Sequence, residues 1–264
     1  MSNYIHGYVP EEQERLVEQA GVLGSLIYPR IDFIGCKHIL EIGSGVGAQT
    51  QVLLDLFPEI RITCVDAESK QLEKAQVNLD SFKGRLNFEH QDARNLQLNE
   101  KFDGAFICWV LEHIPEPIQV LRSLKSHLLP GSKIWLTEVY NSSFYFYPEL
   151  SGLRNYYEKF NQFQRSLGGD PDVGLKLGNL LHEAGFIDIN LFPGGFHLSQ
   201  HDPNTLRRIT TYWKGLMKSG ADSMLEAQLI KEEEIRIMEQ DLDTISEDRN
   251  AVFYYRFVQA SATI

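Results

Sequence analysis

The sequence predicts an α/β fold in which a seven-stranded, mostly parallel sheet carries helices on both faces, with a helical lid beside it. Three observations indicate this fold. Short apolar runs that suit buried strands recur through the first half of the 264 residues, and helical patterns separate most of them. A glycine-rich turn follows the first run, and two more strand-like runs appear in the second half. Strands that alternate with helices indicate right-handed crossovers between parallel strands.

Each expected element has its own pattern. Residues 11–28 place apolar side chains on one face of a helix. Buried strands are expected at 38–43, 61–66, 86–90, 103–109, 133–139, 186–192 and 252–259. Helices are expected near 48–57, 69–82 and 117–129, and again before Gly185, which suits a helix C-cap. After residue 140 the alternation stops, since residues 144–163 carry eight aromatic side chains and residues 203–245 read as charged helices.

These patterns divide the chain into three parts. Residues 1–35 are expected to form an N-terminal helical leader or flap. The core sheet is assigned to residues 36–140, 174–192 and 250–264. Two insertions, 141–172 and 196–245, would form a helical lid over the carboxyl ends of the strands, where ligands bind in open parallel sheets.

Charge and cysteine content narrow the function classes. The formal net charge of −11 and the pI near 5.2 disfavour a nucleic-acid partner, because affinity for the phosphate backbone rests on clustered Lys and Arg. The three cysteines form no CxxC or Cys/His cluster, which favours a reducing cytoplasm and no metal site. The N-terminus lacks a signal-peptide pattern, and no apolar stretch of roughly 18 residues predicts a membrane span.

The glycine-rich turn, ILEIGSGVGAQT at residues 39–50, suggests a nucleotide-bearing cofactor. Gly43 suits a tight turn at the strand end, and Gly45 and Gly47 let the backbone approach a ligand closely. The same letters fit the nicotinamide-dinucleotide fingerprint G-x-G-x-x-A and the E-x-G-x-G-x-G loop of methyl-transferring enzymes. The spacing alone leaves both cofactors open.

Three acidic positions bear on that choice. Asp66 ends the second strand about 20 residues after the turn, where a carboxylate accepts from ribose hydroxyls in either class. Glu41 lies inside a strand that should be buried on both faces, which suggests a cationic or amino-bearing ligand beside it. Asp92, in HQDARNL after the third strand, is placed to accept from an adenine amine. The last two observations favour the methyl-transfer loop.

The motif series is similar to class I S-adenosylmethionine-dependent methyltransferases. It runs LEIGSGVG, VDAESKQLEKA, QDARNL, FDGAFICWVLEHI and LLPGSKIWL, covers about residues 40–140, and most resembles the small-molecule group related to the ubiquinone/menaquinone methyltransferases. The resemblance implies a Rossmann-like core and S-adenosyl-L-methionine as cofactor. The N-terminal YIHGYVPEEQERL also resembles the leader of some small-molecule methyltransferases, whereas the second half of the chain matches only in outline.

The resemblance also implies roles for individual residues. Gly43, Ser44, Gly45 and Gly47 would surround the methionine moiety, and the backbone carbonyl of Cys108 would accept a hydrogen bond from the cofactor's amino group. Asp66 would bind the ribose, Ala67 would flank the adenine, and Asp92 and Ala93 would contact the adenine edge. Tyr4 or Tyr8 in the leader would cover the cofactor. The Asp-Pro-Pro-Tyr type of motif used to methylate base amines is absent after the fourth strand, which disfavours a nucleic-acid base as acceptor.

The expected activity is therefore methyl transfer to a nitrogen, oxygen or carbon nucleophile of a small, apolar or aromatic metabolite. His113, just past the fourth strand, is the candidate general base, because a histidine ordinarily titrates near neutrality. Two alternatives stay open. One is a nicotinamide-dependent oxidoreductase, although no Tyr-x-x-x-Lys pair accompanies its fingerprint; the other is a catalytically inactive S-adenosylmethionine-binding regulator. A homo-oligomer, with the leader closing over a neighbour's site, also stays open.

Overall fold

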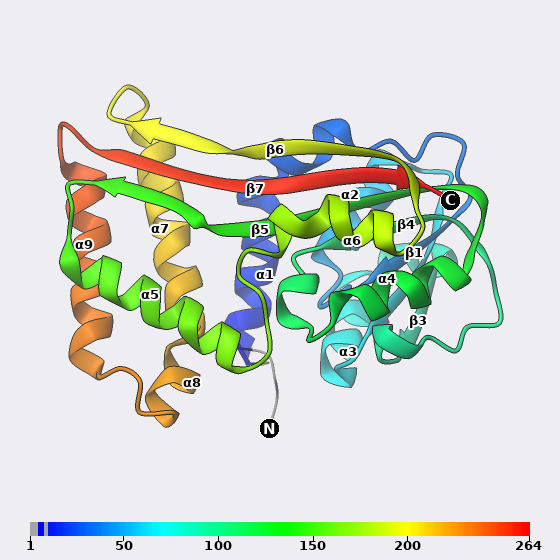
Figure 1. The fold of residues 1–264 in the computed structure, drawn as a ribbon, viewed down its shortest axis with the longest axis horizontal. Helices are drawn as coiled ribbons and strands as arrows, with labels where there is room; N and C mark the ends of the chain where they lie inside the picture. The colour runs from blue at the N-terminus through cyan, green and yellow to red at the C-terminus, as the bar shows by residue number, and fades with distance from the viewer. Residues whose placement is uncertain (1–4, 8–9) are drawn as a thin grey trace.

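The computed structural model describes residues 5–7 and 10–264, and its centre is one seven-stranded sheet (Figure 1). The strands lie in the order β3-β2-β1-β4-β5-β7-β6. They are β1 (His38–Ile42), β2 (Arg61–Asp66), β3 (Leu86–His90), β4 (Phe102–Cys108), β5 (Leu128–Tyr147), β6 (Ile187–Ser199) and β7 (Val252–Thr263). The first five pair in parallel, and β7 runs antiparallel between β5 and β6. The predicted mostly parallel sheet of seven strands is confirmed.

Helices connect and cover these strands. The α-helices are α1 (Pro10–Ile27), α2 (Ala48–Leu56), α3 (Ser69–Asn78), α4 (Pro117–Ser126), α5 (Ser151–Ser166), α6 (Leu177–Glu183), α7 (Pro203–Ser219), α8 (Ala221–Glu226) and α9 (Glu232–Glu247). Short 3-10 helices are η1 (Tyr28–Arg30), η2 (Asp80–Arg85), η3 (Ala93–Asn95), η4 (Leu111–His113) and η5 (Val173–Lys176). Among the described residues, no helix combines the length and apolar character that a membrane span requires.

Helices cover both faces of the sheet because successive side chains along each strand point to opposite faces. In β4, Phe106 packs in a cluster with α1 and α2, whereas Ala105 and Ile107 pack in a second cluster with α4 and α6. Successive strand residues point to opposite faces, so an unbroken apolar run such as β4 needs helices on each side. The β1 strand is buried throughout. This packing holds the carboxyl ends of β1, β2 and β4 next to one another.

The sheet reaches further into the predicted lid than the sequence suggested. β5 continues to Tyr147 and pairs with β7 beyond a register shift between Tyr140 and Tyr145, and β6 continues to Ser199. Residues 141–147 and 196–199 are therefore strand, not lid. The side chains of residues 144–147 alternate between the two faces, as in a strand. Phe144 and Phe146 are buried, whereas Tyr145 and Tyr147 on the other face are 51% and 45% exposed.

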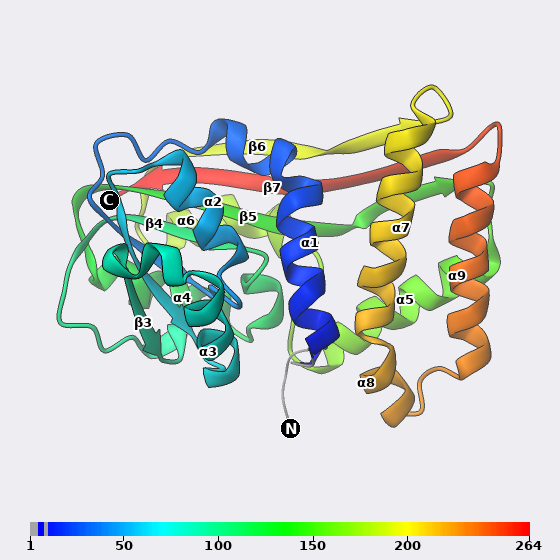
Figure 2. The ribbon, with the colours of Figure 1, turned by 180° about the vertical axis from the view of Figure 1, so that it is seen from behind.

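The helical part stands on these strand extensions. α5, α7 and α9 pack on one another beneath the extended ends of β5, β6 and β7, and α1 lies between α7 and the core helices (Figure 2). Phe144, Trp213 and Phe253 bring β5, α7 and β7 into ring contact, with centroids 5.1–5.4 Å apart. The helical part and the sheet consequently share one apolar core.

Candidate functional site

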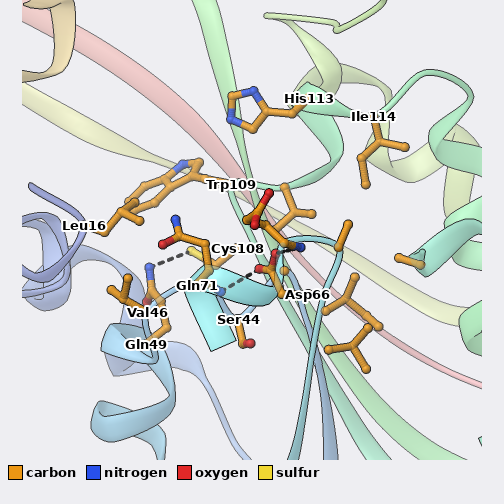
Figure 3. A pocket seen from close by; sticks show the side chains of 18 of the residues that line it. Leu16, Ser44, Val46, Gln49, Asp66, Gln71, Cys108, Trp109, His113 and Ile114 are labelled. Carbon is orange, nitrogen blue, oxygen red and sulfur yellow. Dashed lines mark hydrogen bonds between the residues drawn. The ribbon is translucent and has the colours of Figure 1, made fainter. Parts of the chain in front are cut away.

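A cavity of about 510 Å³ opens at the carboxyl ends of the parallel strands, where the glycine-rich turn meets α1 (Figure 3). We call it the outer cavity. Its lining comes from the turn after β1, from the ends of β2 and β4, from the loop after β3, and from α1. This is the position at which open parallel sheets bind ligands. Cavities of this size hold molecules as large as nucleotides and drugs.

The glycine-rich turn forms the floor of the outer cavity. Gly43, Ser44 and Gly45 line it, and the Gly45 N–H donates to Asp66 Oδ2 at 2.8 Å. Gly45 has a positive φ of 53°, and a Cβ there would touch only Leu16, at 3.7 Å. Gly47 is not in the lining, and a Cβ on it would lie 2.5 Å from Leu79 Cδ1, at the end of α3. The structure thus gives Gly47 a packing role, and its expected approach to the ligand stays a prediction.

Asp66 and Ala67 line the cavity where β2 ends. Asp66 Oδ2 accepts from Gly45, and Oδ1 accepts from the Glu68 N–H at 2.9 Å. Burial raises the pKa of this carboxyl above its ordinary value, although both hydrogen bonds oppose the shift. Each carboxylate oxygen has a lone pair left for a ligand hydroxyl. Asp66 thus lines the outer cavity, and its expected role in binding a ribose stays a prediction.

Asp92 and Ala93 also line the cavity, on the loop after β3. Arg94 occupies the Asp92 carboxylate, with its Nη2 2.6 Å from Oδ2 and its Nε 3.0 Å from Oδ1. This guanidinium holds the pKa of Asp92 below its ordinary value. The expected adenine contact would thus have to share a carboxylate that is already paired. The sequence could have indicated this pairing, because Arg94 follows Asp92 by two residues in HQDARNL.

Cys108 and Trp109 form the wall at the end of β4. The Cys108 thiol accepts from Gln49 Nε2 at 3.5 Å. Trp109 has a positive φ of 56°, and its N–H donates to Thr137 O at 2.8 Å. A non-glycine residue in this conformation is uncommon and is typical of functional sites. Figure 3 shows Trp109 and His113 above the turn that carries Ser44.

A second, smaller cavity of about 50 Å³ lies behind Trp109, between the sheet and the helical part. We call it the inner cavity. Aromatic side chains dominate its lining: Trp109, Tyr157, Phe160, Tyr212, Trp213 and Tyr255. Five described residues line both cavities, namely His6, Gln19, Trp109, Glu112 and Leu216, and we call them the junction. The two cavities are therefore neighbouring parts of one site.

His113 and Glu112 lie side by side on η4. His113 lines the outer cavity as expected, with Nε2 3.5 Å from Glu112 Oε1. Burial lowers the pKa of His113 to about 3, so the expectation that it titrates near neutrality is wrong. Burial shifts the pKa of a carboxyl in the opposite direction and raises that of Glu112 to about 7. Glu112, which the sequence reasoning did not select, is thus the η4 group that titrates near neutrality.

Two further carboxyl groups define the surroundings. Glu138 on β5 accepts the N–H groups of Val110 and Leu111 at 3.1 and 2.9 Å, which fixes the turn into η4. Glu41 on β1 accepts from Thr50 Oγ1 at 2.7 Å, facing α2. Glu41 is not part of either lining among the described residues, and the Thr50 hydroxyl is its partner in the structure. The expected cationic or amino-bearing ligand beside Glu41 stays a prediction.

Several lining residues had no signal in the sequence. α1 contributes Arg15, Leu16 and Gln19, and α2 and α3 contribute Gln49 and Gln71. They are separated along the chain and meet only because α1 packs beside α2. The predicted flap residues Tyr4 and Tyr8 lie outside the described residues. Within the described part of the chain, no group of three or more His, Cys, Asp or Glu has the arrangement of a metal site.

Comparison with known proteins gives this geometry a family. A family model described as "Methyltransferase domain" matches residues 40–134. An O-methyltransferase of Pyrenophora dematioidea is 28% identical over 70% of this chain and 69% of its own length. An O-methyltransferase of Aspergillus nomiae is 27% identical over 70% of this chain and 81% of its own.

Solved structures show the same fold. Phosphoethanolamine N-methyltransferase 2 of Haemonchus contortus, in complex with phosphomonomethylethanolamine and S-adenosylhomocysteine, superposes with a TM-score of 0.56 at 14% identity. The match covers 93% of this chain and 52% of that one, so the chain spans about half the length of that protein. The family match spans the glycine-rich turn, and it decides against the nicotinamide alternative. Residues 40–134 are a methyltransferase domain, and the chain is an S-adenosylmethionine-dependent methyltransferase.

Proposed function

We propose that this enzyme transfers a methyl group to a hydroxyl oxygen of a small, apolar or aromatic molecule. The observation that carries the proposal is the pair of adjoining cavities, an outer one built on the nucleotide turn and an inner one walled by aromatic rings. The relatives named O-methyltransferases support oxygen as the acceptor atom. An aromatic pocket excludes water and suits a planar apolar body.

The residues of the outer cavity fit S-adenosylmethionine. Gly45 leaves room for a ligand against the backbone, and Asp66 keeps free acceptor positions for ribose hydroxyls. Ala67 and Ala93 offer small apolar contacts beside an adenine, and the Cys108 carbonyl would receive the amino group at the methionine end. When bound, the cofactor supplies a methyl group already activated on a sulfonium. The chain's own task is to orient the acceptor and exclude water.

Trp109 and Leu216 line both cavities, so they would lie between the two ligands. Because in-line transfer needs the acceptor atom close to the methyl carbon, the acceptor hydroxyl would lie beside these two side chains. We place the rest of the acceptor at the junction, against the aromatic lining of the inner cavity. A reducing cytoplasm fits the three unpaired, buried cysteines, Cys36, Cys64 and Cys108. Self-association stays a prediction.

Calorimetry with S-adenosylhomocysteine and NADH, followed by methyl-transfer assays, tests this function. We expect micromolar binding of S-adenosylhomocysteine, no NADH binding, and methyl transfer to simple phenols. Transfer to amines in preference to phenols would move the acceptor from oxygen to nitrogen. Cofactor binding without transfer to any phenol or amine would favour the inactive-regulator alternative.

A further inference from the structure

The junction is the place where chemistry has to occur if the proposed function holds. A methyl group carried in the outer cavity can meet an acceptor that reaches it from the side of the inner cavity only where the two cavities adjoin. Of the five junction residues, Glu112 alone carries a carboxylate. A hydroxyl is a poor nucleophile until its proton is removed, so a proton acceptor at this point would have a direct use.

Glu112 is held firmly in this position. Its side chain is nearly buried, and Oε2 accepts from Gln164 Nε2 of α5 at 2.9 Å. Its backbone carbonyl accepts from the Asp170 N–H, also at 2.9 Å, and Glu138 fixes the two residues before it. Gln164 thus orients the carboxylate, and the other two contacts fix the backbone that carries it. A buried side chain with its rotamer fixed loses little entropy when it meets a substrate.

The charge surroundings leave Glu112 able to exchange a proton near neutrality. Arg15, the cation that acts on Glu112, holds Glu12 through Nε at 2.6 Å and Nη2 at 2.7 Å. The other titratable groups that face Glu112 are His113 beside it, His6, Glu138, Cys108, Tyr157, Tyr212 and Tyr255. Burial raises the pKa values of these tyrosines and of Cys108 and lowers that of His6, so all of them are neutral at pH 7.

We propose that Glu112 is the catalytic proton acceptor and that a planar, hydroxylated ring lies at the junction with its hydroxyl pointing at this carboxylate. This inference rests on the proposed function. In the step, the acceptor O–H bond breaks as its proton moves to Glu112. The oxygen forms a bond to the methyl carbon, and the C–S bond of the sulfonium breaks to leave a thioether. Glu112 then returns its proton to water.

The two histidines at the site fit this reaction less well than Glu112. A proton acceptor works best when its pKa lies near the working pH, and burial lowers the pKa of His113 to about 3. The pKa of His6 is also well below its ordinary value, for the same reason. His113 stays beside Glu112 as a neutral imidazole 3.5 Å away. Replacing His113 would therefore change the packing around Glu112 more than the proton transfer.

The test compares two acceptors, phenol and 4-nitrophenol, in the wild type and in Glu112→Gln. Phenol keeps its proton at pH 8, whereas 4-nitrophenol is largely ionised in solution. We expect Glu112→Gln to lose about 100-fold or more in kcat with phenol and less than about tenfold with 4-nitrophenol. The wild-type rate with phenol should rise with pH through about 7, as Glu112 loses its proton, and this rise should disappear in Glu112→Gln.

Control variants and binding measurements separate chemistry from folding. Glu116→Gln, on the exposed stretch just after η4, should keep the wild-type profile. Gln164→Ala removes a hydrogen bond that favours the charged carboxylate, so it should move the rise to higher pH. S-adenosylhomocysteine affinity by calorimetry should be unchanged in Glu112→Gln. Quenching of tryptophan fluorescence by 4-nitrophenol, with S-adenosylhomocysteine present, should show that the variant still binds the acceptor.

The outcomes distinguish the possible failures. Equal losses with the two acceptors, or a pH profile unchanged by Glu112→Gln, would overturn the role of Glu112 and leave the methyltransferase function standing. Methylation of neither phenol by the wild type, with S-adenosylhomocysteine bound, would overturn the inference together with the hydroxyl acceptor. A wild type that binds no S-adenosylhomocysteine would contradict the proposed function itself.

Discussion

At the scale of single residues, the two aspartates of the outer cavity differ in what they already bind. Asp66 accepts two backbone N–H groups and has no cationic partner among the described residues. Asp92 holds the Arg94 guanidinium and is half exposed. A paired, hydrated carboxylate gains little from one more hydrogen bond, whereas a buried, unpaired one gains more. The two residues should therefore contribute unequally to cofactor binding.

Replacing Asp66 with Asn should weaken S-adenosylhomocysteine binding by about 1–3 kcal/mol, or roughly 5- to 150-fold in Kd. The loss follows because the amide replaces one charged acceptor of the ribose hydroxyls with a donor. Calorimetry measures the difference directly. Asp92→Asn is the matched control, for which we expect less than about 1 kcal/mol. Equal effects of the two changes would show that the cofactor is held by the loop after β3 as much as by β2.

Residues near the glycine turn could be placed from sequence because their positions depend on local chain geometry. Gly45, Asp66 and Cys108 follow directly from where parallel strands end, and all three line the cavity. Gln71 and Leu16 could not be placed, because helix packing brings them there and no spacing encodes it. The Thr50 partner of Glu41 could not be placed for a related reason, since it lies nine residues on, across a turn.

At the scale of elements, strand positions were predictable and strand lengths were not. Six strands begin within one residue of the expected position, because an apolar run marks a buried strand. The end of β5 was missed because its outer part alternates buried and exposed aromatic residues, and the end of β6 was missed because its outer part has no buried residue. Strand pairing with β7 decides the structure there. The existence of the helical part followed from composition, but its contact with α1 did not.

The contact between η5 and β5 gives a prediction at this scale. A Cβ on Gly174 would lie 2.6 Å from the carbonyl oxygens of Glu138 and Val139, and backbone cannot rotate away. Gly174→Ala should therefore destabilise the fold by about 1–3 kcal/mol through overpacking. Because β5 carries Glu138, the turn into η4 should loosen as well. Urea denaturation measures the change in unfolding free energy.

Gly215→Ala is the matched control for that experiment. Gly215 lies inside α7, and a Cβ there meets nothing within 4 Å. Alanine has the higher helix propensity, so this variant should be neutral or more stable by about 0.5–1 kcal/mol. Equal stability of the two alanine variants would contradict the packing of η5 against β5.

At the scale of the whole molecule, three buried carboxyl groups make stability depend on pH. Burial raises the pKa values of Glu41 and Glu138 to about 8 and that of Glu112 to about 7. An unfolded glutamate has a pKa near 4.3, so the folded chain holds more protons than the unfolded chain between these values. Their contribution to stability is complete below the unfolded pKa and is lost as pH rises through the folded values.

The buried histidines oppose this trend only at lower pH. Burial lowers the pKa values of His6, His38 and His113, so their contribution is present above about 6.5 and is lost as pH falls below it. Between pH 6.5 and 8 the carboxyl groups therefore act alone among these residues. Each carboxyl that keeps its proton lowers the unfolding free energy by up to about 1.4 kcal/mol per pH unit as pH rises.

Glu138→Gln tests this balance, because an amide oxygen can still accept the N–H groups of Val110 and Leu111 while the ionisation is removed. We expect the wild type to lose stability from pH 6.5 to 8 and the variant to lose less, so that Glu138→Gln is the more stable protein at pH 8. Thermal denaturation at four pH values across this window measures both slopes. A Glu138→Ala variant, which loses the hydrogen bonds as well, should be less stable than Glu138→Gln throughout. Parallel slopes for wild type and Glu138→Gln would mean that Glu138 is ionised in the folded protein and that the fold tolerates its charge.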